Sequence, residues 1–176
     1  MRFNQTTIKG LYIIEPDRLE DERGFFARTF CQKEFLANGL NPRLVQCSIS
    51  YNKRKGTLRG MHYQIAPMAE AKLVRCTKGA IYDVSIDLRK NSNTYLQSIA
   101  FELTSDNHIM IYIPEGFAHG FQTLEDNSEV FYQMSEFYAS EYAQGFRYDD
   151  PAFGIKWPLK TVIISEKDKK YQNIKI

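Results

Sequence analysis

The fold is decided by the stretch Lys72-Leu73-Val74-Arg75-Cys76-Thr77-Lys78-Gly79-Ala80-Ile81-Tyr82-Asp83-Val84-Ser85-Ile86-Asp87-Leu88. Apolar and polar residues alternate through its second half, and its first half holds a short apolar run. Both patterns are typical of β-strands with one or two buried faces. Gly79 stands between the halves, where a tight turn favours glycine. The stretch therefore predicts two strands, Lys72–Lys78 and Ala80–Leu88, joined by a turn at Gly79.

Similar short segments, bounded by Gly, Pro, Asn and Asp, recur along the whole chain. A second turn is predicted at Ser105-Asp106-Asn107. Only Gln32–Asn38 has the pattern of a helix, and Gly39 after it is typical of a helix C-terminus. About ten strands with so little helix favour an antiparallel sandwich or barrel. The other predicted strands are Ile8–Ile14, Phe25–Phe30, Arg43–Tyr51, Gly56–Gln64, Leu96–Leu103, His108–Ile113, Glu129–Phe137 and Thr161–Ile164.

Length and composition narrow the class of protein. The 176 residues suit one domain, 1–176, that buries about 70% of its unfolded surface. A net charge of +2 gives no reason to expect a nucleic-acid partner. No apolar run approaches the ~20 residues that a membrane span needs. Three cysteines without metal-binding spacing fit a reducing compartment. We therefore expect a soluble, cytoplasmic protein with no nucleic-acid or membrane partner.

One of the three histidines, His62, stands among cations and aromatic residues, and a second, His119, stands among aromatic residues. His62 lies in Leu58-Arg59-Gly60-Met61-His62-Tyr63-Gln64, with Lys72 eight residues on, and His119 lies in Ile113-Pro114-Glu115-Gly116-Phe117-Ala118-His119-Gly120-Phe121. A proton acceptor beside cations suggests acid/base chemistry on an anionic substrate. Residues an even number apart share one face of a strand, so Arg59 and His62 face opposite ways unless a bulge intervenes. From spacing alone, a buried structural role for His62 is favoured over a catalytic one.

Pro114–His119 matches the second metal motif of the cupin barrels, so a metal site is one hypothesis for this chain. The first cupin motif supplies two histidines one residue apart and a glutamate, and this chain has no counterpart. The remaining ligands are too few for a metal site. The sequence therefore predicts no metal and no cofactor.

Four other residues, one tyrosine and three aspartates, have no clear role by themselves. Tyr132 is one of 11 tyrosines, and Asp168 lies in a polar stretch typical of a turn. Asp83 and Asp87 are spaced to share a strand face, so one or both could orient a histidine if they point inward.

Several motifs in a fixed order identify a family. From Gly10 to about Asp168 the chain resembles the dTDP-4-dehydrorhamnose 3,5-epimerases, cupin-type jelly-roll enzymes of deoxysugar synthesis. The resemblance implies an all-β jelly roll of antiparallel strands with few short helices. The matching motifs are Asp21-Glu22-Arg23-Gly24-Phe25-Phe26, Leu58–Gln64, Lys72-Leu73-Val74-Arg75-Cys76, Tyr82–Arg89, Ile113–Phe121, Asp149-Asp150-Pro151, Gly154–Pro158 and Ser165–Asp168.

The resemblance also implies roles for ten residues and a homodimer, because that family offers Arg23 across a dimer interface. The implied catalytic residues are His62 as base, Asp168 as its dyad partner, Tyr132 as acid on the opposite face of the sugar, and Lys72 as donor to the C4 keto oxygen. The implied substrate-binding residues are Arg23 and Arg59 on the diphosphate, Gln46 and Ser48 on the nucleotide side, and His119 and Lys167 on the substrate.

The expected reaction is epimerisation at C3 and C5 of a nucleotide-linked 4-keto-6-deoxyhexose, most simply dTDP-4-dehydro-6-deoxy-D-glucose to dTDP-4-dehydro-L-rhamnose, for cell-surface polysaccharide synthesis. Departures from the family lie on the nucleotide side: Arg28 and Ala143 stand where glutamates are common, and Ser48 replaces an asparagine. Four alternatives stay open. They are an epimerase that inverts one carbon, an epimerase of a CDP- or GDP-linked sugar, a metal-dependent cupin oxygenase, and a non-catalytic sugar-nucleotide binding domain.

Overall fold

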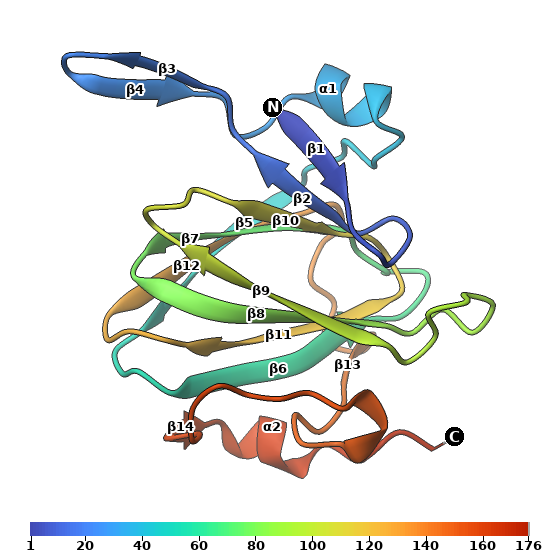
Figure 1. Cartoon of the computed structure of the whole chain (residues 1–176). Helices are drawn as coiled ribbons and strands as arrows, with labels where there is room; N and C mark the ends of the chain where they lie inside the picture. The colour runs from blue at the N-terminus through green and yellow to red at the C-terminus, as the bar shows by residue number, and fades with distance from the viewer. Residues whose placement is uncertain (176) are drawn as a thin grey trace.

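Two antiparallel sheets pack face to face in the computed structural model, which describes residues 1–175 (Figure 1). The first sheet has the order β1 (Arg2–Gln5), β2 (Tyr12–Glu15), β10 (Met110–Ile113), β7 (Lys72–Lys78), β12 (Ser128–Met134) and β5 (Gln46–Asn52). The second sheet has the order β13 (Ala143–Gly145), β6 (Thr57–Gln64), β11 (Phe117–Thr123), β8 (Ala80–Asp87) and β9 (Ser98–Thr104), with β14 (Ile163–Ile164) parallel to β6. The predicted all-β fold is confirmed.

The predicted turn at Gly79 connects the two layers. β7 pairs with β10 and β12 in the first sheet, whereas β8 pairs with β11 and β9 in the second. Gly79 has a φ of +72°, and a Cβ there would approach the Ser128 Oγ to 2.6 Å, so glycine is required. The turn after β9 likewise leads to β10 in the other sheet. Both turns therefore fold the chain back across the sandwich rather than close hairpins within one sheet.

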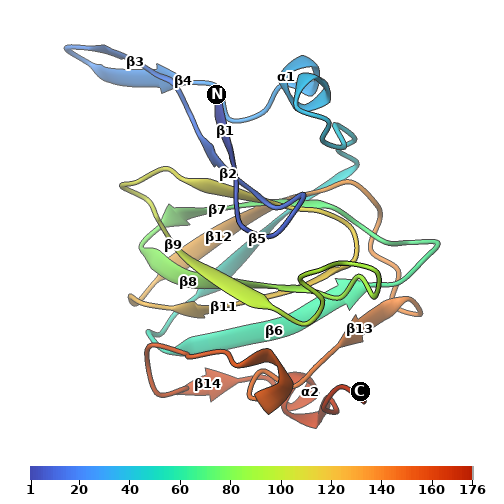
Figure 2. The same ribbon diagram turned by 45° about the vertical axis from the view of Figure 1, so that its right-hand side comes forward.

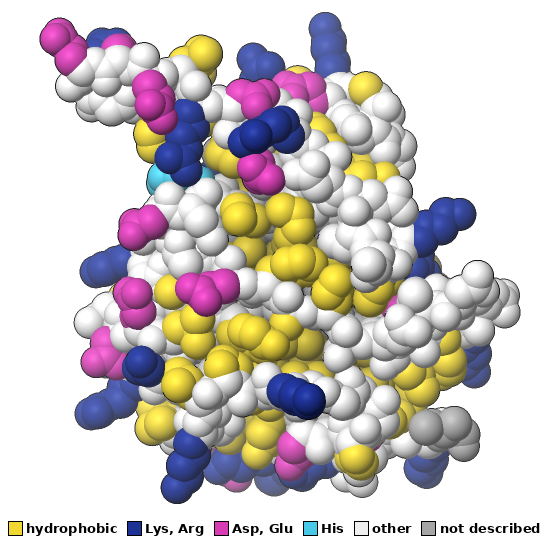
Figure 3. Space-filling view, viewed as in Figure 1, with side chains coloured by type: hydrophobic (Ala, Val, Ile, Leu, Met, Phe, Trp, Pro, Cys, Tyr) yellow, Lys and Arg dark blue, Asp and Glu magenta, His cyan; other side chains and the backbone are white. Residues whose placement is uncertain are grey.

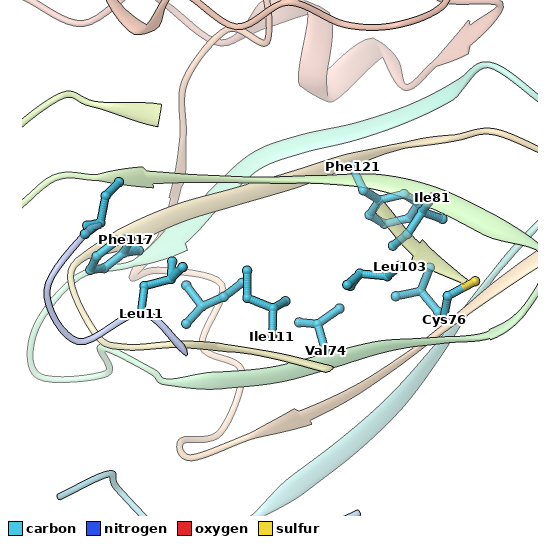
Figure 4. Close-up of a cluster of buried hydrophobic side chains, with 11 residues drawn as sticks. Leu11, Val74, Cys76, Ile81, Leu103, Ile111, Phe117 and Phe121 are labelled. Carbon is cyan, nitrogen blue, oxygen red and sulfur yellow. The ribbon is translucent and has the colours of Figure 1, made fainter. Parts of the chain in front are cut away.

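The apolar core lies between the two sheets (Figure 4). It is formed by inward-facing residues of both sheets and by two residues that precede β2. Its buried members are Ile8, Leu11, Val74, Cys76, Ile81, Leu103, Ile111, Ile113, Phe117, Phe121 and Val130. Ile8 and Leu11 were predicted within a strand, but that strand begins only at Tyr12.

Short segments cover the outer faces of the sheets. α1 (Gln32–Ala37), close to its predicted position, packs Phe35 on the outer face of the first sheet. The C-terminal segment, with η1 (Pro151–Phe153) and α2 (Glu166–Lys170), lies beneath the second sheet in both ribbon views (Figure 2). α2 was not predicted, because Ser165–Asp168 has the composition of a polar turn. No helix among residues 1–175 is long and apolar enough to cross a membrane.

A hairpin of β3 (Arg18–Asp21) and β4 (Gly24–Ala27) stands away from the sandwich. Acidic side chains gather at its tip in the space-filling view (Figure 3). Leu19 and Phe26 on this hairpin are 69% and 71% exposed. A projecting ribbon with large exposed apolar side chains is typical of a surface that meets another molecule.

Candidate active site

A cavity of about 370 Å³ opens between the sheets beside the apolar core, and Phe121 belongs to both. Strands of both sheets contribute inward-facing side chains to it. The lining residues are Gln46, Ser48, Ser50, Arg59, His62, Glu70, Lys72, His119, Gly120, Phe121, Tyr132, Met134 and Tyr138. Most are polar, which is typical of a site for a polar ligand.

A β-bulge in β6 turns Arg59 and His62 toward the same cavity. His62 lies opposite His119 and Arg59 opposite Phe121, so three steps on β6 match two steps on β11. The extra residue falls at Gly60, which has a φ of +122° and lies so close to Gly120 that a Cβ would approach its Cα to 2.6 Å. Strand alternation predicted that Arg59 and His62 face opposite ways unless a bulge intervenes, and this bulge puts both side chains on one face.

His62 forms a hydrogen-bonded pair with Asp168, here called the His62 pair. Its Nε2 lies 2.7 Å from Asp168 Oδ1, and the Gly60 backbone N–H donates to Oδ2 at 3.3 Å. α2 presents Asp168, and the Ser165 hydroxyl caps this helix by accepting from the Asp168 N–H. Burial alone would raise the pKa of Asp168, but the hydrogen bonds from His62 and Gly60 outweigh it and hold the pKa below its ordinary value. An ionised Asp168 accepts the Nε2 proton, so Nδ1 is the ring nitrogen free to take up another.

His119 forms a second pair of the same kind with Asp83, here called the His119 pair. Nε2 lies 2.7 Å from Asp83 Oδ2, and both side chains are almost fully buried. Asp83 is thus the aspartate that orients a histidine, whereas Asp87 accepts hydrogen bonds from Arg89, Ser92 and Thr94. Asp83 Oδ1 has no hydrogen-bond partner among residues 1–175.

Tyr132 reaches the cavity from the first sheet, opposite the wall that carries His62. It lies on β12 across from Ser48 and Val74, and its ring meets the His119 ring edge-on at 6.0 Å between centroids. Burial raises the pKa of Tyr132 well above its ordinary value, and the charge of Asp83 adds to this while Arg59 partly opposes it. The phenol therefore keeps its proton at neutral pH and is suited to donate it.

Lys72 enters the cavity at the start of β7 and forms an ion pair that the sequence reasoning missed. Its Nζ lies 3.2 Å from Glu70 Oε1. Both side chains are nearly buried, with 12% of Lys72 and 10% of Glu70 exposed. The sequence signal that could have indicated Glu70 is its position two residues before Lys72, which faces inward from the start of β7.

The substrate-binding residues expected from the sequence, apart from Arg23, are divided between two cavities. Arg59, Gln46 and Ser48 line the main cavity, where Arg59 Nε donates to Asn52 Oδ1 at 2.7 Å. Lys167 lies instead in an adjoining cavity of about 180 Å³, which shares His62, Glu70, Lys72 and Tyr138 with the main one. Tyr138, which sequence reasoning also missed, therefore stands where the two cavities meet.

Arg23 is absent from both cavities. It lies at the tip of the β3–β4 hairpin, is 85% exposed and pairs with Asp21. Arg28 is likewise engaged within its own chain, since it pairs with Glu34. Eight of the ten sequence-derived site residues therefore line the two joined cavities. Asp168 lies behind His62 and contacts it by a hydrogen bond, and Arg23 lies outside.

No group of three or more His, Cys, Asp and Glu side chains that could hold a metal ion occurs within residues 1–175.

Comparisons with known proteins identify the family. The family model described as dTDP-4-dehydrorhamnose 3,5-epimerase matches residues 5–175. The enzyme of that name from Methanothermobacter thermautotrophicus is 46% identical over 177 residues, covering 99% of this chain and 95% of its own length. The crystal structure of the same-named protein from Elizabethkingia anophelis has a TM-score of 0.95 at 39% identity, covering 98% of this chain and 96% of that one. The Legionella pneumophila dTDP-6-deoxy-D-glucose-3,5-epimerase, solved in complex with dTDP-4-keto-L-rhamnose, has a TM-score of 0.92 at 37% identity, covering 98% and 92%. The chain belongs to the dTDP-4-dehydrorhamnose 3,5-epimerase family.

Proposed function

We propose that this enzyme converts dTDP-4-dehydro-6-deoxy-D-glucose to dTDP-4-dehydro-L-rhamnose by inverting C3 and C5. The observation that carries the proposal is the placement of a histidine and a tyrosine on opposite walls of one cavity that also holds a lysine. Inversion at carbon needs a base on one side of the sugar and an acid on the other. The Legionella relative, solved with dTDP-4-keto-L-rhamnose, supports the choice of sugar.

His62 is the proposed base. A C–H bond beside a ketone is only weakly acidic, so its proton can be removed only if the enolate oxygen is stabilised as charge develops. The Lys72 ammonium lines the same cavity and can donate to that oxygen. Asp168 holds the Nε2 proton of His62 and favours the imidazolium that forms when Nδ1 takes up a proton.

Tyr132 is the proposed acid. It stands on the first sheet, so its hydroxyl approaches the sugar from the side opposite His62. Its raised pKa keeps the phenol protonated until a carbanion accepts the proton. One turnover at each carbon thus moves a proton from C–H to His62 and another from Tyr132 to carbon, after which solvent restores both groups.

The remaining polar residues are proposed to hold the nucleotide and the outer part of the sugar. Arg59 presents a planar guanidinium to the diphosphate and is oriented by Asn52. Gln46 and Ser48 form the wall on the nucleotide side. His119 and Lys167 are proposed to contact the sugar from the main and the adjoining cavity.

A homodimer is proposed to complete the site. Arg23 lies on an exposed hairpin outside the cavity of its own chain, where it can reach a second copy. The exposed Leu19 and Phe26 give that hairpin an apolar surface to bury in such a dimer. A cytoplasmic location fits the three free cysteines, Cys31, Cys47 and Cys76.

Incubation with dTDP-4-dehydro-6-deoxyglucose in heavy water tests the function. We expect proton NMR to show deuterium at C3 and C5 together with inversion of both carbons. Deuterium at a single carbon would identify a mono-epimerase, and faster exchange with a CDP- or GDP-linked sugar would change the assigned nucleotide. Exchange at neither carbon of any of these sugars would end the proposal.

A further inference from the structure

We propose that Glu70 is a positioning residue that aims the Lys72 ammonium at the reacting oxygen, an inference that rests on the proposed function. Glu70 belongs to none of the sequence motifs that identified the family, and no role was expected for it. Its place in the structure is nevertheless the junction of the two cavities, which both count Glu70, Lys72 and His62 among their lining residues.

The contact between Glu70 and Lys72 is sheltered. The two charged atoms lie 3.2 Å apart, and the side chains are 10% and 12% exposed. An exposed ion pair on a protein surface has little effect, because water screens it and long side chains move. Here the walls of the cavity limit both effects, so the carboxylate restrains where the ammonium can lie.

The backbone that carries Glu70 is itself fixed. The neighbouring Ala71 N–H donates to Ser135 Oγ at 2.8 Å, and the Ser135 N–H donates to the Ala71 carbonyl at 3.0 Å. Gln64, at the end of β6, donates to the Met68 carbonyl at 2.8 Å. The segment before β7 is therefore tied to β6 and to the residue that follows β12, and Glu70 meets Lys72 from a rigid support.

The chemistry of lysine explains why such a support matters. An ammonium has three N–H donors on a flexible four-carbon chain, and binding an oxygen in one geometry costs rotamer entropy. The ion pair with Glu70 restrains the ammonium before substrate arrives, so less of this entropy remains to be lost when the oxygen binds. A correctly placed ammonium stabilises the ketone oxygen most when that oxygen gains negative charge. Substitution of Glu70 should therefore lower kcat more than it changes KM.

Steady-state kinetics on Glu70→Ala and Glu70→Gln test the inference. We expect Glu70→Ala to lower kcat between about 10-fold and 100-fold, the loss that a misplaced catalytic group causes, with little change in KM. Glu70→Gln keeps an acceptor for the ammonium and should recover part of the loss. Glu15→Gln is the matched control, because Glu15 pairs with Arg2 on the first sheet outside both cavities. An unchanged kcat in Glu70→Ala, or a change confined to KM, would overturn the inference.

A double-mutant cycle separates positioning of Lys72 from a general structural effect. In a Lys72→Met background, Glu70→Ala should lower kcat no further, because its effect passes through the ammonium. Full additivity of the two losses would contradict the role.

The same double-mutant cycle, measured by denaturant unfolding, gives the coupling free energy between Glu70 and Lys72 and does not require turnover. If the wild-type enzyme exchanges no carbon-bound hydrogen in heavy water, the proposed function fails while coupling in unfolding is still measurable. If the wild type turns over and Glu70→Ala matches it, the role of Glu70 alone fails.

Discussion

The two histidine–aspartate pairs share one cavity and one hydrogen-bond length, 2.7 Å, yet they differ in access to that cavity. The His62 side chain is 42% exposed, whereas the His119 side chain is 5% exposed. A base that removes a proton from a bound sugar must meet both substrate and solvent, because solvent takes its proton away. A histidine–aspartate pair alone therefore does not define the base, and the exposure of the histidine ring distinguishes His62 from His119.

The supports of the two aspartates differ as well. Asp83 lies on β8, which has a strand on each side, and one of its oxygens lacks a partner among residues 1–175. Asp168 comes from α2, at the other end of the chain, and both of its oxygens accept hydrogen bonds. The His62 pair therefore joins distant parts of the sequence, whereas the His119 pair joins neighbouring strands of one sheet.

The largest expected effect comes from exchanging each aspartate for asparagine. Asp168→Asn should lower turnover about 1000-fold or more, because an amide that donates to Nε2 moves the ring proton to Nδ1 and removes the base. Asp83→Asn should lower turnover only about tenfold, since it disturbs His119, which is proposed to contact the substrate but not to accept the proton. Product formation followed by proton NMR measures both rates. Equal losses in the two variants would break the distinction between the pairs.

Tyr132→Phe removes the proposed acid and leaves both histidine–aspartate pairs intact. We expect deuterium to enter the sugar from heavy water, because His62 still removes the proton. Inversion should fall about 100-fold, the contribution of one general acid. NMR separates the two results, since exchange with retention leaves the ring couplings of the substrate unchanged. Inversion at the wild-type rate would remove Tyr132 from the mechanism.

The stability of the protein should depend on pH through Asp168. Its pKa in the folded protein lies below the ordinary value of 3.8, so its stabilisation is fully present above that value and is lost as the pH falls through the folded pKa. The side-chain amide of the variant Asp168→Asn cannot titrate. The free energy of unfolding of the wild type should therefore exceed that of the variant by about 2 kcal/mol near neutral pH, with the difference shrinking below pH ~4. Urea unfolding from pH 7 to pH 3 measures this, and a constant difference would contradict it.

The smallest expected effect concerns the cap that holds Asp168 in place. Ser165→Ala removes the hydroxyl that accepts from the Asp168 N–H and should cost about 1 kcal/mol in the free energy of unfolding. Ser165→Thr keeps the cap and is the matched control. The His119 pair has no such cap, because Asp83 lies within a strand. Denaturant unfolding compares the two variants, and a threonine variant as unstable as the alanine variant would argue against the cap.

The sequence predicted the layers of this fold better than their connections. Lys72–Lys78 was predicted with its observed ends, because apolar pattern and the glycine after it agree. β11 was not predicted as a strand, although it is central to the second sheet, because glycine and histidine interrupt its apolar pattern. β7 and β8, which flank Gly79, join different sheets because of long-range strand pairing. A single sequence carries little information about such pairing.

The site was predictable mainly through family resemblance. Spacing placed Arg59 and His62 on opposite faces, and only the bulge at Gly60 brings them together. Asp168 and His62 are far apart in the sequence, so their contact has no local signal. Glu70 and Tyr138 were not predicted, because glutamate and tyrosine also occur at many positions outside any functional site. Arg23 was expected to act across a dimer interface, and it lies on an exposed hairpin outside the cavities of its own chain.

Hydrogen exchange by His62→Asn and His119→Asn tests the central claim most directly. Each variant is incubated with the dTDP-linked keto-sugar in heavy water, and deuterium at C3 and C5 is followed over time by NMR. The proposed mechanism predicts that His119→Asn still exchanges both hydrogens, while His62→Asn, folded and able to bind dTDP, exchanges neither. Exchange by His62→Asn at the rate of His119→Asn would contradict it.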